Sequence, residues 1–199
     1  MTSTESATHP ADKIGAAAIP VIPTHLKRLV LTGFMGAGKS TIGRLLAERL
    51  NWNFLDLDAH LEARTGSTIP QLFAEQGEAR FRRLESTALA SALGLTNTVL
   101  ALGGGTPEDL TNRLLLEQTP GTFTVFLDAP FPTLFDRCML QDIARPVLED
   151  PAAAQLRFSH RHPLYTRISR LIIDTAALTA DQTVEAILSG LHQTPYPTT

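Results

Sequence analysis

The sequence predicts an α/β fold of three layers, in which a five-stranded parallel sheet lies between helices. Three observations favour this fold. Short apolar runs alternate with longer helical patterns from residue 27 onward, which is the order typical of parallel sheets covered on both faces. A glycine-rich loop joins the first apolar run to the first helical pattern. The length of 199 residues, with 43% hydrophobic and 19% charged residues, suits one globular domain.

The five expected strands are short runs of apolar and β-branched residues, as buried strands usually are. In chain order they are residues 28–32 (RLVLT), 53–57 (NFLDL), 98–102 (TVLAL), 122–127 (TFTVFL) and 171–174 (LIID). Ligands of open parallel sheets gather beyond the carboxyl ends of the strands. The residues that directly follow each strand are therefore the candidates for a site.

Amphipathic patterns predict the helices between and after these strands. They cover residues 39–50, 58–65, 69–92, 108–117, 131–140, 151–168 and 181–192. Thr68 with Gln71 predicts a capping box at the start of the third helix. Asp181 is the expected cap of the last helix, and Pro163 is expected to bend or end the helix in which it lies.

We expect a single domain over residues 27–193. Residues 1–26 are the expected flexible leader and residues 194–199 the expected tail, because chain ends are often poorly ordered. Residues 139–151 mix polar side chains with two prolines between two helical patterns. This composition predicts a mobile lid.

The composition argues against several classes of function. Cys138 is the only cysteine, which excludes an intrachain disulfide and is compatible with a reducing compartment. The net charge of −3 gives no overall attraction to nucleic acid or to an anionic membrane. No run approaches the roughly 18 apolar residues of a membrane-spanning helix. We therefore expect no nucleic-acid partner and no membrane.

The loop after the first strand has the sequence GFMGAGKS at residues 33–40, which satisfies the phosphate-loop pattern G-x-x-x-x-G-K-[ST]. Glycines let backbone N–H groups surround phosphate oxygens, and the following helix adds its free donors and its dipole. Lys39 should reach the β- and γ-phosphates, and the Ser40 hydroxyl should ligate Mg²⁺. The residues expected to bind the nucleotide phosphates are Gly36, Ala37, Gly38, Lys39, Ser40 and Thr41.

Two acids close the second strand. Strand alternation would point Asp56 and Asp58 to one side and Leu57 to the other. Asp56 is the candidate to hold Mg²⁺ through water, since this ion keeps much of its hydration. Asp58 is the candidate to orient an acceptor hydroxyl and take its proton. The alternative is a pair of acids that cap the next helix.

Arg82 shares a helix face with Glu78 and Glu85. One interpretation is an exposed set of ion pairs. The other is an arginine that Glu85 holds and that binds a substrate carboxylate. Phe73 and Phe81 are the candidates for an apolar wall beside it, although either could be plain core.

Further candidates lie on later segments. Arg145 precedes Pro146 in the predicted lid, where a side chain could contact phosphate, and Arg161 is a second candidate for the substrate. Gly103, Gly104 and Gly105 follow the third strand, and three glycines there favour a close approach of backbone to a ligand over a plain turn. The histidines on either side of Arg161 form no metal-ligand set with other residues.

Together these motifs resemble the shikimate kinase family over residues 28–192. The ordered set is GFMGAGKSTIGRLLA, DLD, RTGSTIPQLFAEQGEARFRRLE, LALGGG, RP and RHPLY. The resemblance implies that Arg82 and Arg161 grip the substrate carboxylate, that Asp58 binds a substrate hydroxyl and that the backbone of Gly104 contacts the substrate. It also implies that Arg145 reaches the nucleotide phosphates.

The resemblance implies a nucleoside monophosphate kinase-like fold and the ATP-dependent phosphorylation of the 3-hydroxyl of shikimate, a step of chorismate and aromatic amino-acid biosynthesis. The expected partners are ATP, shikimate and one Mg²⁺, and we expect a cytoplasmic monomer. The chain departs from the family pattern at Leu57, where a small hydroxyl residue is usual. It also lacks basic residues that the family places near adenine: Cys138 follows Arg137, and residues 176–178 are Ala-Ala-Leu.

Two other functions are compatible with parts of the pattern. A gluconate kinase-like enzyme would share the phosphate loop, but two widely spaced arginines favour shikimate. A catalytically silent nucleotide-binding regulator would share the fold, but Lys39, Ser40, Asp56 and Asp58 are all present, which argues against lost chemistry.

Overall fold

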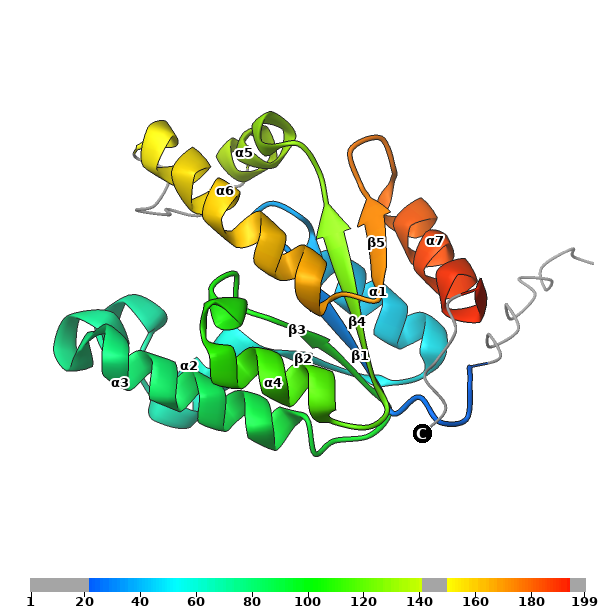
Figure 1. Cartoon of the computed structure of the whole chain (residues 1–199), viewed down its shortest axis with the longest axis horizontal. Coiled ribbons are helices and arrows are strands. Elements are labelled where there is room, and N and C mark those ends of the chain that lie inside the picture. Colours follow the sequence, from blue (N-terminus) through cyan, green and yellow to red (C-terminus); the bar gives the residue numbers. More distant parts are fainter. Residues whose placement is uncertain (1–21, 141–149, 194–199) are drawn as a thin grey trace, which may run out of the picture.

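A parallel five-stranded sheet forms the middle layer of the molecule (Figure 1). The computed structural model describes residues 22–140 and 150–193. The strands are β1 (Arg28–Thr32), β2 (Asn53–Asp56), β3 (Thr98–Ala101), β4 (Thr122–Asp128) and β5 (Leu171–Asp174). Their order in the sheet is β2-β3-β1-β4-β5. The predicted sheet is confirmed, with β1 in its centre.

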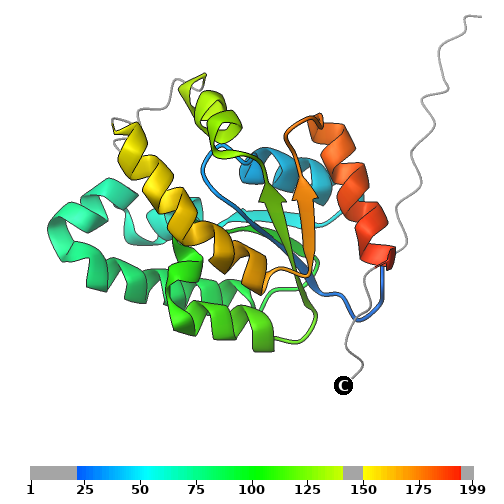
Figure 2. The ribbon, with the colours of Figure 1, turned by 45° about the horizontal axis from the view of Figure 1, so that its top comes forward.

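Helices cover both faces of this sheet. They are α1 (Lys39–Leu50), α2 (Leu57–Thr65), α3 (Ile69–Ala92), the short 3-10 helix η1 (Thr106–Glu108), α4 (Leu110–Gln118), α5 (Phe131–Met139), α6 (Pro151–Ile168) and α7 (Ala180–Gln193). Figures 1 and 2 both show α1 and α7 on one side of the sheet and α3 and α4 on the other. The helix α5 lies beyond the arrowhead of β4, whereas α6 runs from beside α5 back along the sheet (Figure 2).

Each face of β1 supplies one hydrophobic core. Leu29 and Leu31 are fully buried in a cluster with Leu46 of α1 and Ile187 of α7. Val30 points the other way, into a cluster that includes residues of α2, α3 and α4. Successive residues of a strand alternate between faces, and so a central strand buried on both faces must be apolar almost throughout. This double burial fixes β1, and with it the loop that follows.

Two helix starts show how local sequence sets the boundaries. The capping box predicted at Thr68 is present: Gln71 N donates to Thr68 Oγ1 at 3.4 Å and Thr68 N donates to Gln71 Oε1 at 2.8 Å. At α7 the prediction of Asp181 as the cap is wrong. Thr179 and Gln182 exchange the same pair of hydrogen bonds there, and Asp181 lies in the first turn, where its charge suits the helix dipole.

Pro163 does not end its helix, because α6 continues as far as Ile168. Proline removes one backbone donor, but Tyr165 and Ile168 beyond it are buried against the rest of the molecule. The third helix does change direction, at Gly77, which has φ 73° and ψ 165° within α3. No helix in residues 22–140 or 150–193 is long and apolar enough to cross a membrane.

Some predictions fall outside the described residues. The predicted lid covers residues 139–151, and its residues 141–149, Arg145 among them, lie there. Most of the predicted leader and the tail at 194–199 lie there as well. From the end of the leader, Leu26 is buried in the core on the α1 face.

Candidate active site

The phosphate loop lies between β1 and α1, at the carboxyl edge of the sheet. Gly36 and Gly38 have φ values of 78° and 84°, a left-handed conformation that glycine adopts without strain. A Cβ on Gly36 would overlap the Leu134 carbonyl of α5 and lie 2.9 Å from Cys138 Sγ. The loop is therefore packed closely under α5. Lys39 folds back over the loop, and its Nζ donates to the Gly33 carbonyl at 2.9 Å.

A cavity of about 360 Å³ opens beside this loop. Its lining includes Gly36, Gly38, Thr41, Arg137, Leu178 and Thr183. The Arg137 guanidinium donates to Thr175 Oγ1 at 3.0 Å and to the Thr175 carbonyl at 2.6 Å. Arg137 therefore ties α5 to the segment after β5, and both segments form walls of the cavity.

Ser40, in the first turn of α1, lies next to Asp56, the last residue of β2. Ser40 Oγ donates to Asp56 Oδ2 at 2.7 Å. Asp56 Oδ1 also accepts from Ala59 N at 3.3 Å, so Asp56 is the N-cap of α2. The capping alternative is therefore confirmed for Asp56, and its role toward Mg²⁺ stays a prediction. Two hard oxygen ligands side by side next to a phosphate loop fit the preference of Mg²⁺.

Asp58 does not lie in a strand. The second strand ends at Asp56, and α2 begins at Leu57, so the argument from strand alternation was wrong for this pair. The capping of Ala59 N by Asp56 starts the helix one residue earlier than expected. Leu57 is nevertheless buried in the core on the opposite side, as expected.

Asp58 occupies an unfavourable place for a negative charge. Burial, followed by the charges of Asp56 and Glu85, raises its pKa from 3.8 to about 6, although the charge of Lys39 opposes the rise. A Cβ on Gly103 would lie 2.5 Å from Asp58 Oδ1, so the first glycine after β3 makes room for this carboxylate. Asp58 thus lies between the phosphate loop and the acids of α3.

Of the other two glycines after β3, only Gly105 lies tightly against an arginine. A Cβ on Gly105 would lie 2.8 Å from Arg82 Nη1, whereas a Cβ on Gly104 would make an ordinary contact, 3.5 Å from Arg161 Nη1. The Gly104 carbonyl accepts from the Tyr165 hydroxyl of α6 at 2.6 Å. The three glycines thus lie against side chains of Asp58, Arg161 and Arg82, and the close approach of a ligand to their backbone stays a prediction.

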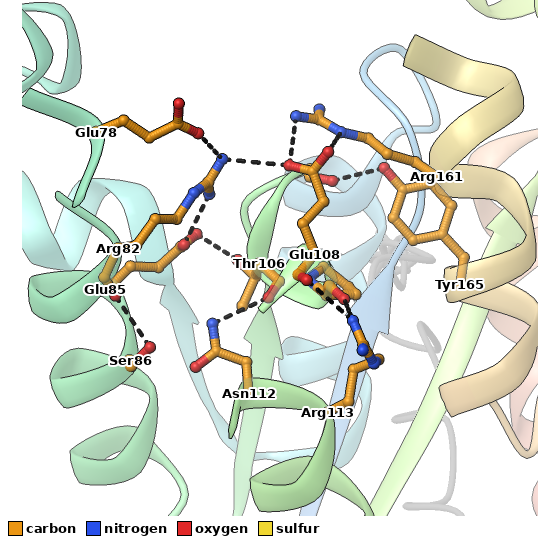
Figure 3. Close-up of polar contacts among 12 residues, drawn as sticks. Glu78, Arg82, Glu85, Ser86, Thr106, Glu108, Asn112, Arg113, Arg161 and Tyr165 are labelled. Carbon is orange, nitrogen blue, oxygen red and sulfur yellow. Dashed lines mark hydrogen bonds and ion pairs between the residues drawn. The ribbon is translucent and has the colours of Figure 1, made fainter. Parts of the chain in front are cut away.

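Arg82 is held on α3 by acids of the same helix (Figure 3). Its Nη1 donates to Glu85 Oε2 at 2.9 Å, and its Nη2 donates to Glu78 Oε1 at 3.3 Å. Glu85 is almost fully buried, and its other oxygen accepts from the Thr106 hydroxyl at 2.7 Å. Burial would lower the pKa of Arg82, but the hydrogen bond to Glu85 and the surrounding acids raise it above its ordinary value. Arg82 is therefore a fixed positive charge.

The two phenylalanines predicted beside Arg82 form a stacked pair. The ring centroids of Phe73 and Phe81 lie 4.4 Å apart, and Arg82 Cζ lies 5.3 Å from the Phe81 centroid. Phe81 is buried, whereas Phe73 is 36% exposed. Phe73 thus provides an accessible apolar surface next to the arginine.

Arg161, on α6, faces Arg82 across the site, and Glu108 lies between them (Figure 3). Glu108 Oε2 lies 2.9 Å from Arg161 Nη2 and 3.2 Å from Arg82 Nη2. Sequence reasoning missed Glu108, Thr106 and Tyr165. The position of Glu108, three residues after the last of three glycines at a strand end, was the available signal.

The fold and these residues define a class: a phosphate-loop α/β protein with a cavity beside the loop and two arginines that converge on one carboxylate. A family model described as shikimate kinase matches residues 35–192. A shikimate kinase of Salinibacter ruber is 40% identical over 172 residues, which are 82% of each protein.

Solved structures give the same result. Shikimate kinase from Acinetobacter baumannii in complex with shikimate is similar with a TM-score of 0.78 and 34% identity, over 84% of this chain and 94% of that one. A gluconokinase from Sinorhizobium meliloti has a TM-score of 0.60 at 20% identity, over 84% of this chain and 92% of its own, and this likeness shows the fold alone.

The chain therefore belongs to the shikimate kinase family. It is an enzyme, a phosphotransferase with an alcohol acceptor, and its reaction is the ATP-dependent phosphorylation of shikimate in aromatic amino-acid biosynthesis. The family expected from the sequence is confirmed. The gluconate kinase-like and catalytically silent alternatives have no comparable support.

Proposed function

We propose that the site described above transfers the γ-phosphoryl group of ATP to the 3-hydroxyl of shikimate, giving shikimate 3-phosphate and ADP. The observation that carries this proposal is the convergence of Arg82 and Arg161 on a single carboxylate, next to a complete phosphate loop. Two fixed guanidinium groups at one point favour an anionic acceptor over a neutral sugar.

Arg82 and Arg161 would bind the carboxylate of shikimate. Glu85 would position Arg82, as its 2.9 Å hydrogen bond supports, and Phe73 and Phe81 would form the wall beside the ring. Bidentate pairing of guanidinium with carboxylate fixes orientation as well as energy. The acceptor would therefore bind in one orientation, with its hydroxyls toward the phosphate loop.

The glycines 103–105 would let the acceptor approach the backbone. We propose that Asp58, at the same end of β3, accepts a hydrogen bond from the reacting hydroxyl and takes its proton. A carboxyl group with a pKa of about 6 is a better proton acceptor than an ordinary aspartate and is still mostly ionised at neutral pH. Hydrogen bonding to a positioned base contributes to phosphoryl transfer chiefly by orienting the nucleophile.

The phosphate loop would hold ATP. Backbone donors of Gly36, Ala37 and Gly38, with the side chains of Lys39, Ser40 and Thr41, would bind the phosphates. Arg137 would contact the nucleoside, because it lines the cavity beside the loop. Arg145 keeps the role that the resemblance implies, at the nucleotide phosphates, and it lies outside the described residues.

Ser40 and Asp56 would hold one Mg²⁺, Asp56 through water. Both donors are oxygens and lie 2.7 Å apart, which fits a hard cation that keeps much of its hydration. When bound, the ion supplies charge neutralisation at the β- and γ-phosphates. We propose that the protein works as a monomer in the cytoplasm.

The test is ADP release by the full chain with ATP and Mg²⁺, comparing shikimate, gluconate and no acceptor. We expect strong release with shikimate alone. Lys39→Ala is the control, and it should lower turnover by about 10² or more, because Lys39 meets the transferring charge. Release with gluconate but not with shikimate would contradict the proposal. Equal release with and without an acceptor would also contradict it.

A further inference from the structure

The two arginines assigned to the acceptor already hold a carboxylate of the chain itself. Glu108 Oε1 accepts from Arg161 Nε at 3.1 Å, and Glu108 Oε2 accepts from Arg161 Nη2 at 2.9 Å. The same Oε2 accepts from Arg82 Nη2 at 3.2 Å. A guanidinium binds a carboxylate through one edge with two N–H groups, so this edge of Arg161 is filled.

We propose that Glu108 is an internal substitute for the substrate carboxylate. In the enzyme without acceptor it occupies the place between Arg82 and Arg161, and shikimate binds by exchanging its own carboxylate for that of Glu108. This inference rests on the proposed function, since it takes the two arginines as the acceptor site.

Among the acids around the arginines, Glu108 is the one suited to exchange. Glu85 is 2% exposed and is also held by Thr106, so it stays in place. Glu78 is 69% exposed and pairs with Arg82 alone. Glu108 is 26% exposed and pairs with both arginines. It is therefore bound where the substrate carboxylate is needed and is still reachable from solvent.

The exchange needs no change in the backbone. The Glu108 carbonyl accepts from Arg113 Nη1 at 3.0 Å, and its N–H donates to the Gly105 carbonyl at 2.9 Å. The main chain of η1 is thus anchored, and rotation of the side chain suffices to release the arginines. His160 is 70% exposed, and its Nδ1 lies 3.6 Å from Glu108 Oε1, which gives the released carboxylate a partner on the solvent side.

Glu108 also keeps the empty site stable and selective. Burial would raise the pKa of Glu108, but the hydrogen bonds and charge of Arg161, with the charge of Arg82, lower it below its ordinary value. The glutamate is therefore ionised at neutral pH and compensates two partly buried guanidinium groups. A neutral molecule cannot replace that charge. The exchange therefore admits carboxylates and rejects uncharged compounds of similar shape.

Competition by Glu108 must weaken the apparent affinity for shikimate, because only the fraction of molecules with released arginines can bind. Titration calorimetry of shikimate into the full chain, without nucleotide, measures this. We expect Glu108→Gln to lower the dissociation constant by roughly tenfold, equivalent to about 1.4 kcal/mol. Glu108→Asp shortens the side chain by one methylene, so that its carboxylate reaches the arginines less well. This variant should lower the dissociation constant by less than Glu108→Gln does.

Glu117→Gln is the matched control, because Glu117 of α4 also pairs with an arginine of α6, Arg167, but outside the site. It should leave the dissociation constant unchanged. If Glu108 only supported the arginines, Glu108→Gln and Glu108→Asp would both weaken shikimate binding. A dissociation constant for shikimate that is unchanged or higher in the two variants therefore overturns the proposal.

Arg161→Lys separates this inference from the proposed function. Suppose that Arg161→Lys raises the dissociation constant for shikimate by about tenfold or more, but the Glu108 variants do not lower it. The exchange by Glu108 is then wrong, and the arginine site stands. If Arg161→Lys leaves the constant unchanged, the arginine site itself is wrong, and the exchange with it.

Discussion

Asp58 shows most clearly how the surroundings of one residue set its chemistry. The carboxylate is enclosed by α2, the glycines after β3 and two other acids, and its pKa rises to about 6. A base that must take a proton near neutral pH works best with a pKa in this range. The same enclosure works against folding, because the ionised form is less stable inside the protein than in the unfolded chain. The proposed role of Asp58 as a base and the stability of the fold therefore make opposite demands on this residue.

The destabilising effect of the ionised Asp58 side chain can be measured as a pH dependence of stability. The pKa of Asp58 in the folded protein lies above the ordinary value of 3.8. The contribution of Asp58 to the free energy of unfolding is therefore fully present below about pH 4 and is lost as the pH rises through about 6. Asp58→Asn should therefore raise the free energy of unfolding by up to about 3 kcal/mol above pH 7, and by little at about pH 4. Urea titrations at both pH values check this. The exposed Glu75→Gln is the control, and a loss of stability in Asp58→Asn above pH 7 would contradict the prediction.

Asp58 should also appear in the kinetics. The value of kcat/KM for shikimate reports ionisation of the free enzyme, so it should fall as the pH is lowered through about 6. Asp58→Asn should lower kcat strongly and remove this acid limb from the residual rate. Rates of both proteins between about pH 5 and 8 would reveal it, and an acid limb that persists in the variant would assign the ionisation to another group.

Arg82 is the second residue whose role can be tested alone. Arg82→Lys keeps the charge but loses the planar set of donors. Removal of one partner from such a pair costs about 2–5 kcal/mol, so the KM for shikimate should rise by more than about tenfold, with the KM for ATP nearly unchanged. Arg83→Lys, at the next and exposed position, is the matched control. Equal effects on both substrates would count against a role at the acceptor.

At the scale of elements, the short helix η1 joins the parts of the proposed acceptor site. Thr106 binds Glu85 of α3, and Glu108 binds Arg161 of α6, while Asn112 of α4 donates to the Thr106 carbonyl at 2.9 Å. The helices α3, α4 and α6 thus meet at two residues of η1. The register of η1 therefore sets the spacing between Arg82 and Arg161.

Thr106→Val tests this junction. The variant keeps the shape but leaves a buried oxygen of Glu85 without its hydrogen bond at 2.7 Å. Because hydrogen bonds to charged groups contribute about 1.5–3 kcal/mol, the free energy of unfolding should fall by about that amount, and the KM for shikimate should rise as Arg82 loses its support. Thr106→Ser keeps the hydroxyl and should stay close to the parent protein in both measurements. A valine variant with unchanged stability would mean that Glu85 finds another donor.

The sequence predicted the elements well where a local signal marks them. Helices α1, α3 and α6 have the predicted bounds, since a phosphate loop, a capping box and a proline after Asp150 define their starts. The boundary between β2 and α2 was misplaced, because Asp56 serves as both a strand end and a helix cap. Glu108 was missed for a different reason. Its partners lie 26 and 53 positions away in the sequence, and no local pattern carries such contacts.

At the scale of the whole molecule, close packing of helices on the sheet depends on a few small residues. A Cβ on Gly43 of α1 would overlap the ring of Phe54 in β2. Gly43→Ala should therefore lower the free energy of unfolding by about 1–3 kcal/mol through overpacking, while the KM for shikimate stays the same. Adding Phe54→Leu should recover part of the loss, because the two changes share one contact. Purely additive losses in denaturant titrations would contradict this.

The order of the strands has a consequence for how the chain folds. Arg28 in β1 pairs with Thr98 in β3 and Thr122 in β4, so the central strand is made first and finds its neighbours only after long stretches of chain have followed. Closing such large loops slows folding. During synthesis, β1 leaves the ribosome as an apolar segment with two unpaired edges, which exposes it to aggregation until β4 emerges. Chaperones that bind extended apolar segments would protect the nascent chain at this stage.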